Sequence, residues 1–299
     1  MIDCAIIGGG PAGLSAALVL GRARRSVVVF DDNRPRNAVT HESHGFLTRD
    51  GIKPSEFRAT AHREISAYPS VEMRWAHVTA VRKQGDIFEV LTDDQEPLQA
   101  RIVLLATGLK EQLPAVDGIY DYYGTSLFNC PYCDGWELRD QPLVLIAEGE
   151  RTFHLAETIW NWSRDLVVCT NGHTVLKDEQ KQLLHKHGIQ VVEDRISALI
   201  GSNGHLERVV FASGEERNCV GGFVLTELSQ AAPFASQLGC DMNAMGGIVT
   251  NPQGRTSVPG VYAAGDATLQ GPAQLILAAA QGSQAAMHIN ATLTERAFH

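Results

Sequence analysis

The stretch CAIIGGGPAGLSAALVLGRARRSVVVFD, residues 4–31, predicts how the chain begins to fold. CAIIGG is typical of a buried apolar strand, GGGPAGLSAALVLGRA of a glycine turn that runs into a helix, and SVVVFDD of a second apolar strand. A helix that crosses over between two such strands makes them parallel neighbours in one sheet. The sequence therefore predicts an α/β fold that opens with a βαβ unit.

Three glycines and an acid in this stretch have the spacing of a dinucleotide-binding turn. Gly8, Gly10 and Gly13 form G-x-G-x-x-G between strand and helix, and Asp31 ends the second strand. The first glycine allows a tight turn, the second lets the backbone approach a pyrophosphate, and the third packs the helix against the strand. Free N–H groups at the helix start bind phosphate, and Asp31 can accept hydrogen bonds from a ribose. We therefore predict a Rossmann-like dinucleotide site here.

Two later segments favour a flavin dinucleotide. RIVLLATGLK ends its apolar run at ATG, residues 106–108, where a glycine permits a tight turn beside a ligand. Near the C-terminus an apolar strand stops at Gly265 and Asp266, and a small-residue helix is expected from about Pro272. Taken by itself, this last segment could also be an ordinary strand, loop and helix whose aspartate lies on the surface without a ligand. Three such elements together suit a long ligand, whose polyol Asp266 can hold.

The middle of the chain predicts a second unit of the same kind. PLVLIAEGERTFHLAETIWNW is typical of a strand, a turn and a helix, and DLVVCTNG of another strand that ends in a turn. IQVVEDRISALIGSNGHLERVVFASG alternates like antiparallel strands with Asn-Gly at a turn, and GGFVLTE is an apolar strand. We predict two Rossmann-like (ββα-type) nucleotide-binding domains, the second inserted in the first. Residues 1–112 and 245–299 form the first, and 113–244 the second.

Charge and cysteine usage limit the partners. The formal net charge of -9 argues against nucleic acid, which requires a basic face. The N-terminus has no basic lead and no small-residue cleavage site, so we expect a cytoplasmic protein. In that reducing compartment six cysteines do not form a disulfide framework. We expect four of them to be packing residues: Cys4, Cys169, Cys219 and Cys240.

Only Cys130 and Cys133 are spaced for joint chemistry, in the stretch NCPYCDGWE, residues 129–137. A zinc site would require a second such pair or histidines at ligand spacing, and the sequence has neither, so no metal site is predicted. Two cysteines so placed at a helix start expose one sulfur and let its partner resolve a mixed disulfide. The pair is therefore a candidate redox centre.

The motifs GGGPAGLSAA at 8–17, ATG at 106–108, CPYCD at 130–134 and SVPGVYAAGDA at 257–267 occur together. With them the chain resembles, over nearly its full length, the low-molecular-weight thioredoxin-reductase family of FAD-dependent disulfide oxidoreductases. The resemblance implies FAD, a homodimer, and an inserted domain that carries the cysteine pair. It places these residues at FAD-contacting positions: Gly8, Gly10, Pro11, Ala12, Gly13, Asp31, Asn37, His44, Val78, Ala106, Thr107, Gly108, Gly265, Asp266, Ala273 and Gln274.

The same resemblance assigns roles around the pair. Cys133 faces the flavin, and Cys130 exchanges with an external substrate. Asp134 resembles the acid that moves a proton to or from the thiols, and a helix N-cap aspartate is the alternative reading of that position. His41 and His44 lie in the 37–45 stretch that would border the flavin, and a histidine there can help to deprotonate a thiol; a surface or packing histidine is the alternative.

The sequence departs from the family at the NADPH site. The turn in the inserted domain has Ala147 and Thr152 in place of the outer glycines, and Glu148 and Glu150 bring negative charge toward the phosphate position. After DLVVC, the family's basic cluster is replaced by TNGH at 170–173. NADPH binding is therefore doubtful. Trp136, Phe153, Trp160 and Trp162 are expected in the core, although a stacking surface for a second FAD is an alternative.

With FDDNRPRNAVTHESHGFLTRDG at 30–51, the chain is most similar to a side branch of dithiol oxidases of the gliotoxin type and disulfide oxidoreductases that work without pyridine nucleotide. We predict a thiol–disulfide oxidoreductase that acts through Cys130 and Cys133 on a thioredoxin-like protein or a small dithiol or disulfide. Oxygen, a ferredoxin or a second flavin is the other redox partner. A conventional NADPH-dependent thioredoxin reductase and a non-catalytic flavin redox sensor are the alternatives.

Overall fold

The structure is a computed structural model that describes residues 1–93 and 96–299. These residues form two compact units. The first contains Met1–Ala38, Gly45–Lys110 and Ser229–His299, and the second contains Val39–His44 and Glu111–Leu228. The second unit is inserted in the chain of the first, and both are α/β, as the sequence predicts.

The first unit is built on a seven-stranded sheet with the order β3-β2-β1-β6-β5-β4, and β17 also pairs with β6. Its helices and strands are β1 (Ile2–Ile7), α1 (Pro11–Arg22), β2 (Val27–Asp31), η1 (Arg36–Val39), α2 (Pro54–Ile65), β3 (Val71–Trp75), β4 (Val78–Gln84), β5 (Ile87–Thr92), β6 (Leu98–Leu105), α6 (Phe234–Gln237), β17 (Val261–Ala263), η3 (Gly265–Thr268) and α7 (Leu275–Phe298). Strands β1, β2, β3, β6 and β17 are parallel, and β4 and β5 add an antiparallel hairpin.

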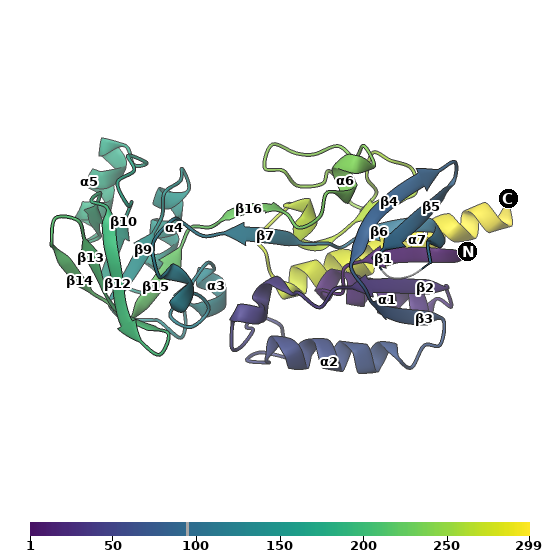
Figure 1. The fold of residues 1–299 in the computed structure, drawn as a ribbon, viewed down its shortest axis with the longest axis horizontal. Coiled ribbons are helices and arrows are strands. Elements are labelled where there is room, and N and C mark those ends of the chain that lie inside the picture. Colours follow the sequence, from purple (N-terminus) through teal and green to yellow (C-terminus); the bar gives the residue numbers. More distant parts are fainter. Residues whose placement is uncertain (94–95) are drawn as a thin grey trace. The chain divides into compact units, whose positions relative to one another are not determined.

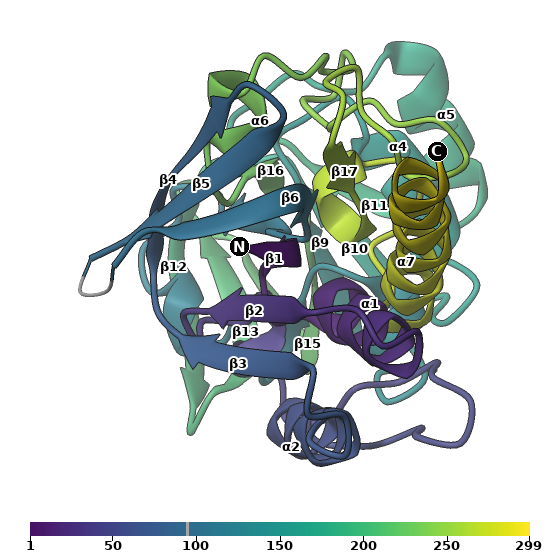
Figure 2. The ribbon, with the colours of Figure 1, turned by 90° about the vertical axis from the view of Figure 1, so that its right-hand side faces the viewer.

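Both faces of this sheet are covered, which explains the continuous apolar strands in the sequence. Alternate residues of β1 point to opposite faces: Cys4 and Ile6 join one core cluster, and Ala5 and Ile7 join the other. Figure 2 shows α1 and α7 side by side on the first of these faces. They approach closely, because a methyl group on Gly282 of α7 would lie 1.9 Å from the carbonyl oxygen of Ala12.

The second unit has a five-stranded parallel sheet, β11-β10-β9-β15-β8, and a three-stranded antiparallel sheet, β12-β13-β14 (Figure 1). Its elements are η2 (Ile119–Asp121), β8 (Leu127–Phe128), α3 (Pro131–Asp134), β9 (Leu143–Ile146), α4 (Thr152–Ile159), β10 (Leu166–Cys169), α5 (Asp178–Lys186), β11 (Gln190–Val192), β12 (Ile196–Ser202), β13 (His205–Phe211), β14 (Glu216–Asn218) and β15 (Gly221–Val224). The predicted Asn-Gly turn joins β12 and β13: Asn203 and Gly204 have φ of 51° and 81°.

Two paired strands, β7 (Leu109–Gln112) and β16 (Glu227–Gln230), contain the places where the chain leaves the first unit and returns to it. The return lies at residue 229, whereas the sequence analysis expected residue 245. Phe234, Ala235 and Cys240 explain this difference, because they are buried in the core of the first unit, against the sheet. The last helix also begins later than expected, at Leu275 rather than near Pro272.

Candidate active site

The glycine turn and the ATG segment, far apart in sequence, lie against each other at the ends of β1 and β6. Gly8 has a φ of 115°, and a methyl group there would lie 2.2 Å from the carbonyl oxygen of Ala106. A methyl group on Gly13 would lie 1.9 Å from the carbonyl oxygen of Gly8. Both glycines are therefore required for packing, as the spacing predicts.

The start of α1 is open for a ligand. Gly10 is the N-cap, no side chain caps the helix, and Pro11 occupies the first turn. A methyl group on Gly10 would meet nothing within 4 Å, and the same holds for Gly108, which has a φ of 67°. A 12-residue helix with uncapped N–H groups and open space before it fits the pyrophosphate of a dinucleotide.

Asp31 lies beside this turn and is held by Arg58 of α2. The guanidinium of Arg58 donates to Oδ2 of Asp31 across 2.5 Å and to Oδ1 of Asn33 across 2.7 Å. The backbone N–H of Asn33 donates to the other carboxylate oxygen of Asp31 across 2.8 Å. A methyl group on Gly9 would lie 2.1 Å from that carboxylate, so Gly9 makes room for it. No pattern in the sequence pointed to Arg58.

Asp266 has an arginine partner too. Arg36 of η1 donates to Oδ2 of Asp266 across 2.9 Å, and both side chains are partly exposed. The neighbouring Gly265, with a φ of 76°, packs on Ala12 of α1, and its N–H donates to Gln281 of α7. The predicted residues Gly265 of η3 and Ala12 of α1 thus meet in the first unit.

The other predicted flavin residues have different settings. A methyl group on Gly45 would lie 3.5 Å from Oε1 of Gln274, so Gly45 lies close to the start of α7. Val78 begins β4, and its side chain is buried in the core. His44 belongs to the second compact unit. The remaining three lie in or next to elements of the first unit: Asn37 lies in η1, Thr107 follows β6, and Ala273 precedes α7.

The cysteine pair forms a disulfide at the start of α3. Cys130 is the N-cap of this short helix and Cys133 lies within it, with their Cα atoms 5.3 Å apart. Pro131 at the first helical position starts the helix, and both cysteines are half-buried. The spacing thus brings the two sulfurs together, as predicted.

Asp134 is the last residue of α3, so it does not cap the start of this helix and that reading of the sequence is wrong. The pKa of its carboxyl group is raised from 3.8 to about 7, mainly by burial and also by the charge of Glu137, while His44 acts in the opposite direction. A carboxyl group with a pKa near neutrality can both accept and donate a proton beside the disulfide.

Glu111 orients the chain just before the disulfide, and the sequence analysis missed it. The side-chain amide of Asn129 donates to Oε1 of Glu111, and the hydroxyl of Tyr123 donates to Oε2 across 2.7 Å. Because Asn129 immediately precedes Cys130, this carboxylate anchors the strand that leads into α3.

The aromatic side chains in and after α3 differ in burial from those of α4. Tyr132, between the two cysteines, is 69% exposed and stacks edge-on against Trp162. Trp136 is 65% exposed, with the guanidinium of Arg139 over its ring, so its predicted place in the core is wrong. Phe153 and Trp160 are partly buried against the core.

The turn between β9 and α4 is the place where the sequence analysis doubted NADPH binding, and both of its ends are buried. Ala147 and Thr152 are fully buried, and the hydroxyl of Thr152 donates to the carbonyl of Gly149 across 2.6 Å. The amide of Asn171 donates to Glu148 across 2.6 Å, and its oxygen accepts the N–H of Ile196. The end of β10 is therefore linked by a hydrogen bond to a carboxylate of the turn.

The four other cysteines are buried thiols, as predicted. Burial raises the pKa of Cys219 to about 11, and it raises the pKa of Cys4, Cys169 and Cys240 too. Within residues 1–93 and 96–299, no three His, Cys, Asp or Glu side chains are grouped to hold a metal ion. No helix in these ranges has both the length and the hydropathy of a membrane span.

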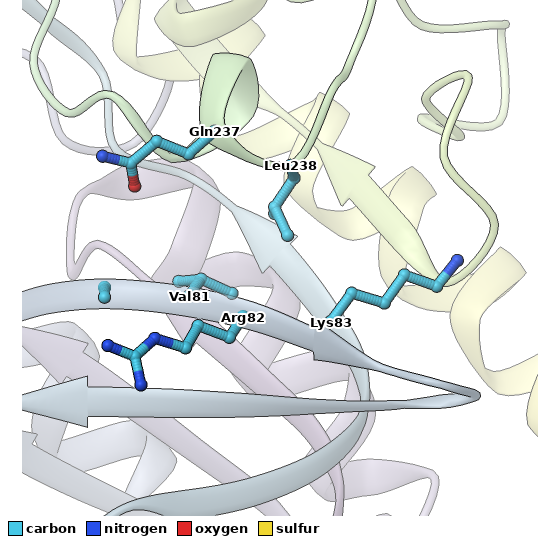
Figure 3. Close-up of a pocket in the computed structure, with 6 residues that line it drawn as sticks. Val81, Arg82, Lys83, Gln237 and Leu238 are labelled. Atoms are coloured by element: carbon cyan, nitrogen blue, oxygen red, sulfur yellow. The ribbon is translucent and has the colours of Figure 1, made fainter.

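A pocket of about 490 Å³ lies between β4 and the end of α6 in the first unit (Figure 3). Figure 3 shows Leu238 pointing toward β4 near Val81, with Gln237 and Arg82 beside them. Arg82 and Lys83 are exposed, and no predicted flavin residue lines the pocket. It is not part of the site described above.

Comparison with known proteins agrees with this geometry. The family model described as pyridine nucleotide-disulphide oxidoreductase matches residues 2–282. A relative from Arthroderma benhamiae, named as a thioredoxin reductase, is 31% identical over 98% of this chain and 80% of its own length. Thioredoxin reductase aclD of Aspergillus oryzae is 30% identical, over 89% of this chain and 88% of that one. The crystal structure of TrxB from Bacillus anthracis, described as a thioredoxin reductase, is 46% identical and covers 99% of both chains with a TM-score of 0.95. The chain therefore belongs to the pyridine nucleotide-disulphide oxidoreductase family, in which it is a flavoprotein disulfide oxidoreductase of the thioredoxin-reductase-like type.

Proposed function

We propose that this enzyme passes electrons between bound FAD and an external dithiol or disulfide through Cys130 and Cys133, without NADPH. The observation that carries the proposal is the disulfide at the start of α3, with a half-buried carboxyl group of pKa about 7 one residue beyond it. Such a pair can open and close while the neighbouring acid moves the proton.

The residues of the first unit fit an FAD. The uncapped start of α1 and the open space at Gly10 suit its pyrophosphate, while Asp31 and Asp266 supply carboxylates for a ribose and a polyol. When bound, FAD supplies a two-electron acceptor and donor for the thiol pair. Arg58 and Arg36 add to the predicted set, since each holds one of these carboxylates in place.

The two cysteines have separate tasks in this proposal. Cys130 attacks or is attacked by the external substrate, and Cys133 exchanges electrons with the flavin. Asp134 accepts a proton from the attacking thiol and returns one to the departing sulfur. The exposed Tyr132 and Trp136 stand on either side of Cys133 in the sequence and offer contact area to a thioredoxin-like protein or a small dithiol.

Packing in the inserted unit supports the absence of NADPH. Glu148 is partly buried in the turn where phosphates would lie, and Asn171 binds it from the position that would select the adenosine ribose. A carboxylate at this place repels a pyrophosphate and a 2′-phosphate. In the TNGH stretch, which stands where the family has a basic cluster, His173 is the one residue that can carry a positive charge. Its Nε2 atom lies 3.9 Å from Oε2 of Glu148, so it faces a carboxylate.

The reaction partner beyond the flavin is oxygen, a ferredoxin or a second flavin, and the enzyme works as a cytoplasmic homodimer. These parts of the proposal are tested by oxygen uptake with a dithiol, by reduction with a ferredoxin, by the count of flavins released per chain, and by the mass in solution.

The decisive experiment is an anaerobic titration of the oxidised holoenzyme, followed by flavin absorbance. Dithiothreitol should bleach the flavin, and Cys130→Ser should abolish bleaching while FAD is retained. NADPH should leave the spectrum unchanged. Rapid bleaching by NADPH would instead establish a conventional thioredoxin reductase, which the names of the relatives favour. Absence of any turnover with dithiols and with thioredoxin would leave a redox sensor.

A further inference from the structure

A short segment of the chain packs on the unit that carries the disulfide, although the residues on both sides of it belong to the other unit. Val39–His44 clusters with Glu111–Leu228. One anchor is tight: Gly124 has a φ of 88°, and a methyl group there would lie 2.3 Å from the carbonyl oxygen of Val39. This packing holds His44, at the end of the segment, beside the disulfide-bearing helix.

Two carboxylates face one ring nitrogen of His44. Its Nε2 atom is 3.7 Å from Oε1 of Glu137 and 3.8 Å from Oε2 of Glu42. The side chain of His44 is 20% exposed, whereas those of Glu137 and Glu42 are 43% and 55% exposed. The imidazole is thus sheltered, and it is flanked by acids that are open to water.

Asp134 follows Cys133 in α3 and is coupled electrostatically to this cluster. The charged groups that act on it are Glu137, three residues along the chain, and His44, from the 39–44 segment. Glu42 faces His44 from within that segment. Asp134 and His44 are therefore both partly buried, whereas Glu137 and Glu42 are exposed to solvent.

We propose that His44 is a positioning residue that acts through Asp134, passing protons between that carboxyl group and the solvent-exposed Glu137 and Glu42. The proposal rests on the proposed function, because it concerns proton transfer during opening of the Cys130–Cys133 disulfide. An imidazole suits this task, since it can accept a proton at one nitrogen and release one at the other near neutral pH.

The exchange balances without a further reactant. An external dithiol loses two electrons and two protons and forms its own S–S bond, while the Cys130–Cys133 bond breaks and both sulfurs become thiols. Asp134 takes the proton from the attacking thiol and returns one to the departing sulfur. The proton taken up leaves Asp134 through His44 to Glu137, Glu42 and bulk water, and the proton for the departing sulfur arrives by the same route, so that Asp134 ends the exchange in the protonation state in which it began.

The test uses the holoenzyme and a rapid acid quench. Oxidised enzyme is mixed with dithiothreitol, quenched, and treated with N-ethylmaleimide, and mass spectrometry counts the opened Cys130–Cys133 pairs. Flavin absorbance is recorded in parallel. The variants are His44→Gln, His44→Gly for rescue by imidazole, Glu137→Gln and the matched control His41→Gln, an exposed histidine of the same segment.

His44→Gln should slow disulfide opening about tenfold near neutral pH. This is less than a general acid or base itself contributes, because His44 acts through Asp134. The midpoint of the variant's pH–rate profile should move to higher pH than in the parent enzyme, because His44 lowers the pKa of Asp134 and the variant loses that effect. Glu137→Gln should move the profile to lower pH, because Glu137 raises that pKa. Added imidazole should restore the rate of His44→Gly, and His41→Gln should behave as the parent.

Three results would overturn the inference: an unchanged pH profile in both the His44 and the Glu137 variants, shifts in the same direction, or no rescue by imidazole. If one variant does not fold, the other still decides the direction of its shift. Failure of the proposed function has a different signature, because disulfides would then open in the quench while the flavin stayed oxidised.

Discussion

Arg36 and Asp266, 230 residues apart in the sequence, are joined by an ion pair of 2.9 Å in the first unit. Arg58 and Asp31 form a second such pair across 2.5 Å. Each carboxylate that the sequence assigned to the flavin thus has an arginine that orients it. The two pairs differ in burial: the first is partly exposed and the second is nearly buried. Their variants should therefore behave differently.

Arg36→Met should weaken FAD binding more than it weakens the fold. The partly exposed pair is worth about 1 kcal/mol, so the Kd for FAD should rise roughly fivefold. Fluorescence titration of apoprotein with FAD measures this change. Arg34→Met, an exposed arginine two residues earlier, is the matched control and should bind FAD as the parent does. An unchanged Kd in Arg36→Met would show that the pair does not orient Asp266.

Arg58→Met should destabilise the first unit itself. Removing one partner of a nearly buried pair leaves an uncompensated charge, which costs about 3 kcal/mol. Thermal unfolding of the apoprotein should show a lower Tm. Asp31→Asn combined with Arg58→Met should recover part of the loss, since no buried charge then remains unpaired. If the double variant is no more stable than Arg58→Met, the charge explanation is wrong.

Gly10→Ala and Gly13→Ala should separate binding from packing in one turn. Gly10 has an ordinary φ of -81° and open space around it, so alanine there should leave the Tm of the apoprotein unchanged and weaken FAD binding at least tenfold. Alanine at position 13 would meet the carbonyl oxygen of Gly8, so it should lower the Tm of the apoprotein itself. Equal effects of the two variants on the apoprotein would contradict this division.

Asp134→Asn should stabilise the second unit above neutral pH. The folded state holds a proton on Asp134 up to a pKa of about 7, so the stability that this group contributes is complete below about pH 4 and is lost as pH rises to 7. Asparagine removes that loss. At about pH 8 the variant should be more stable by about 2 to 4 kcal/mol, with a difference near zero at about pH 4. Tm measured across this range gives the result, and a gain that does not depend on pH would refute the cause.

Thiol titration should distinguish the two classes of cysteine. The oxidised native protein should react with no equivalents of a chromogenic disulfide reagent, because four thiols are buried and two sulfurs are bonded. Mild reduction should expose two equivalents, and reduction in denaturant should expose all six. Reaction of more than two thiols in the folded, reduced protein would show that a buried cysteine is accessible.

Local chemistry made much of the fold predictable. The apolar runs of β1 and β2, the glycine turn and the Asn203-Gly204 hairpin each follow from residues that are close in sequence. The boundary of the inserted unit was missed because Phe234, Ala235 and Cys240 are apolar and would suit either core. Composition alone does not say which sheet such residues cover.

The amino-acid sequence by itself determined the two nucleotide-type units, the open helix start and the spacing that closes the disulfide, because these features depend on neighbours within a few turns of chain. Only the tertiary structure decided which charged side chains that are far apart in the sequence pair with each other. Arg58 reaches Asp31 over 27 residues, and His44 reaches Glu137 from a segment that leaves its own unit. A single arginine or histidine forms no recurring pattern in the sequence that would reveal its partner. The partner is set by how distant elements pack together.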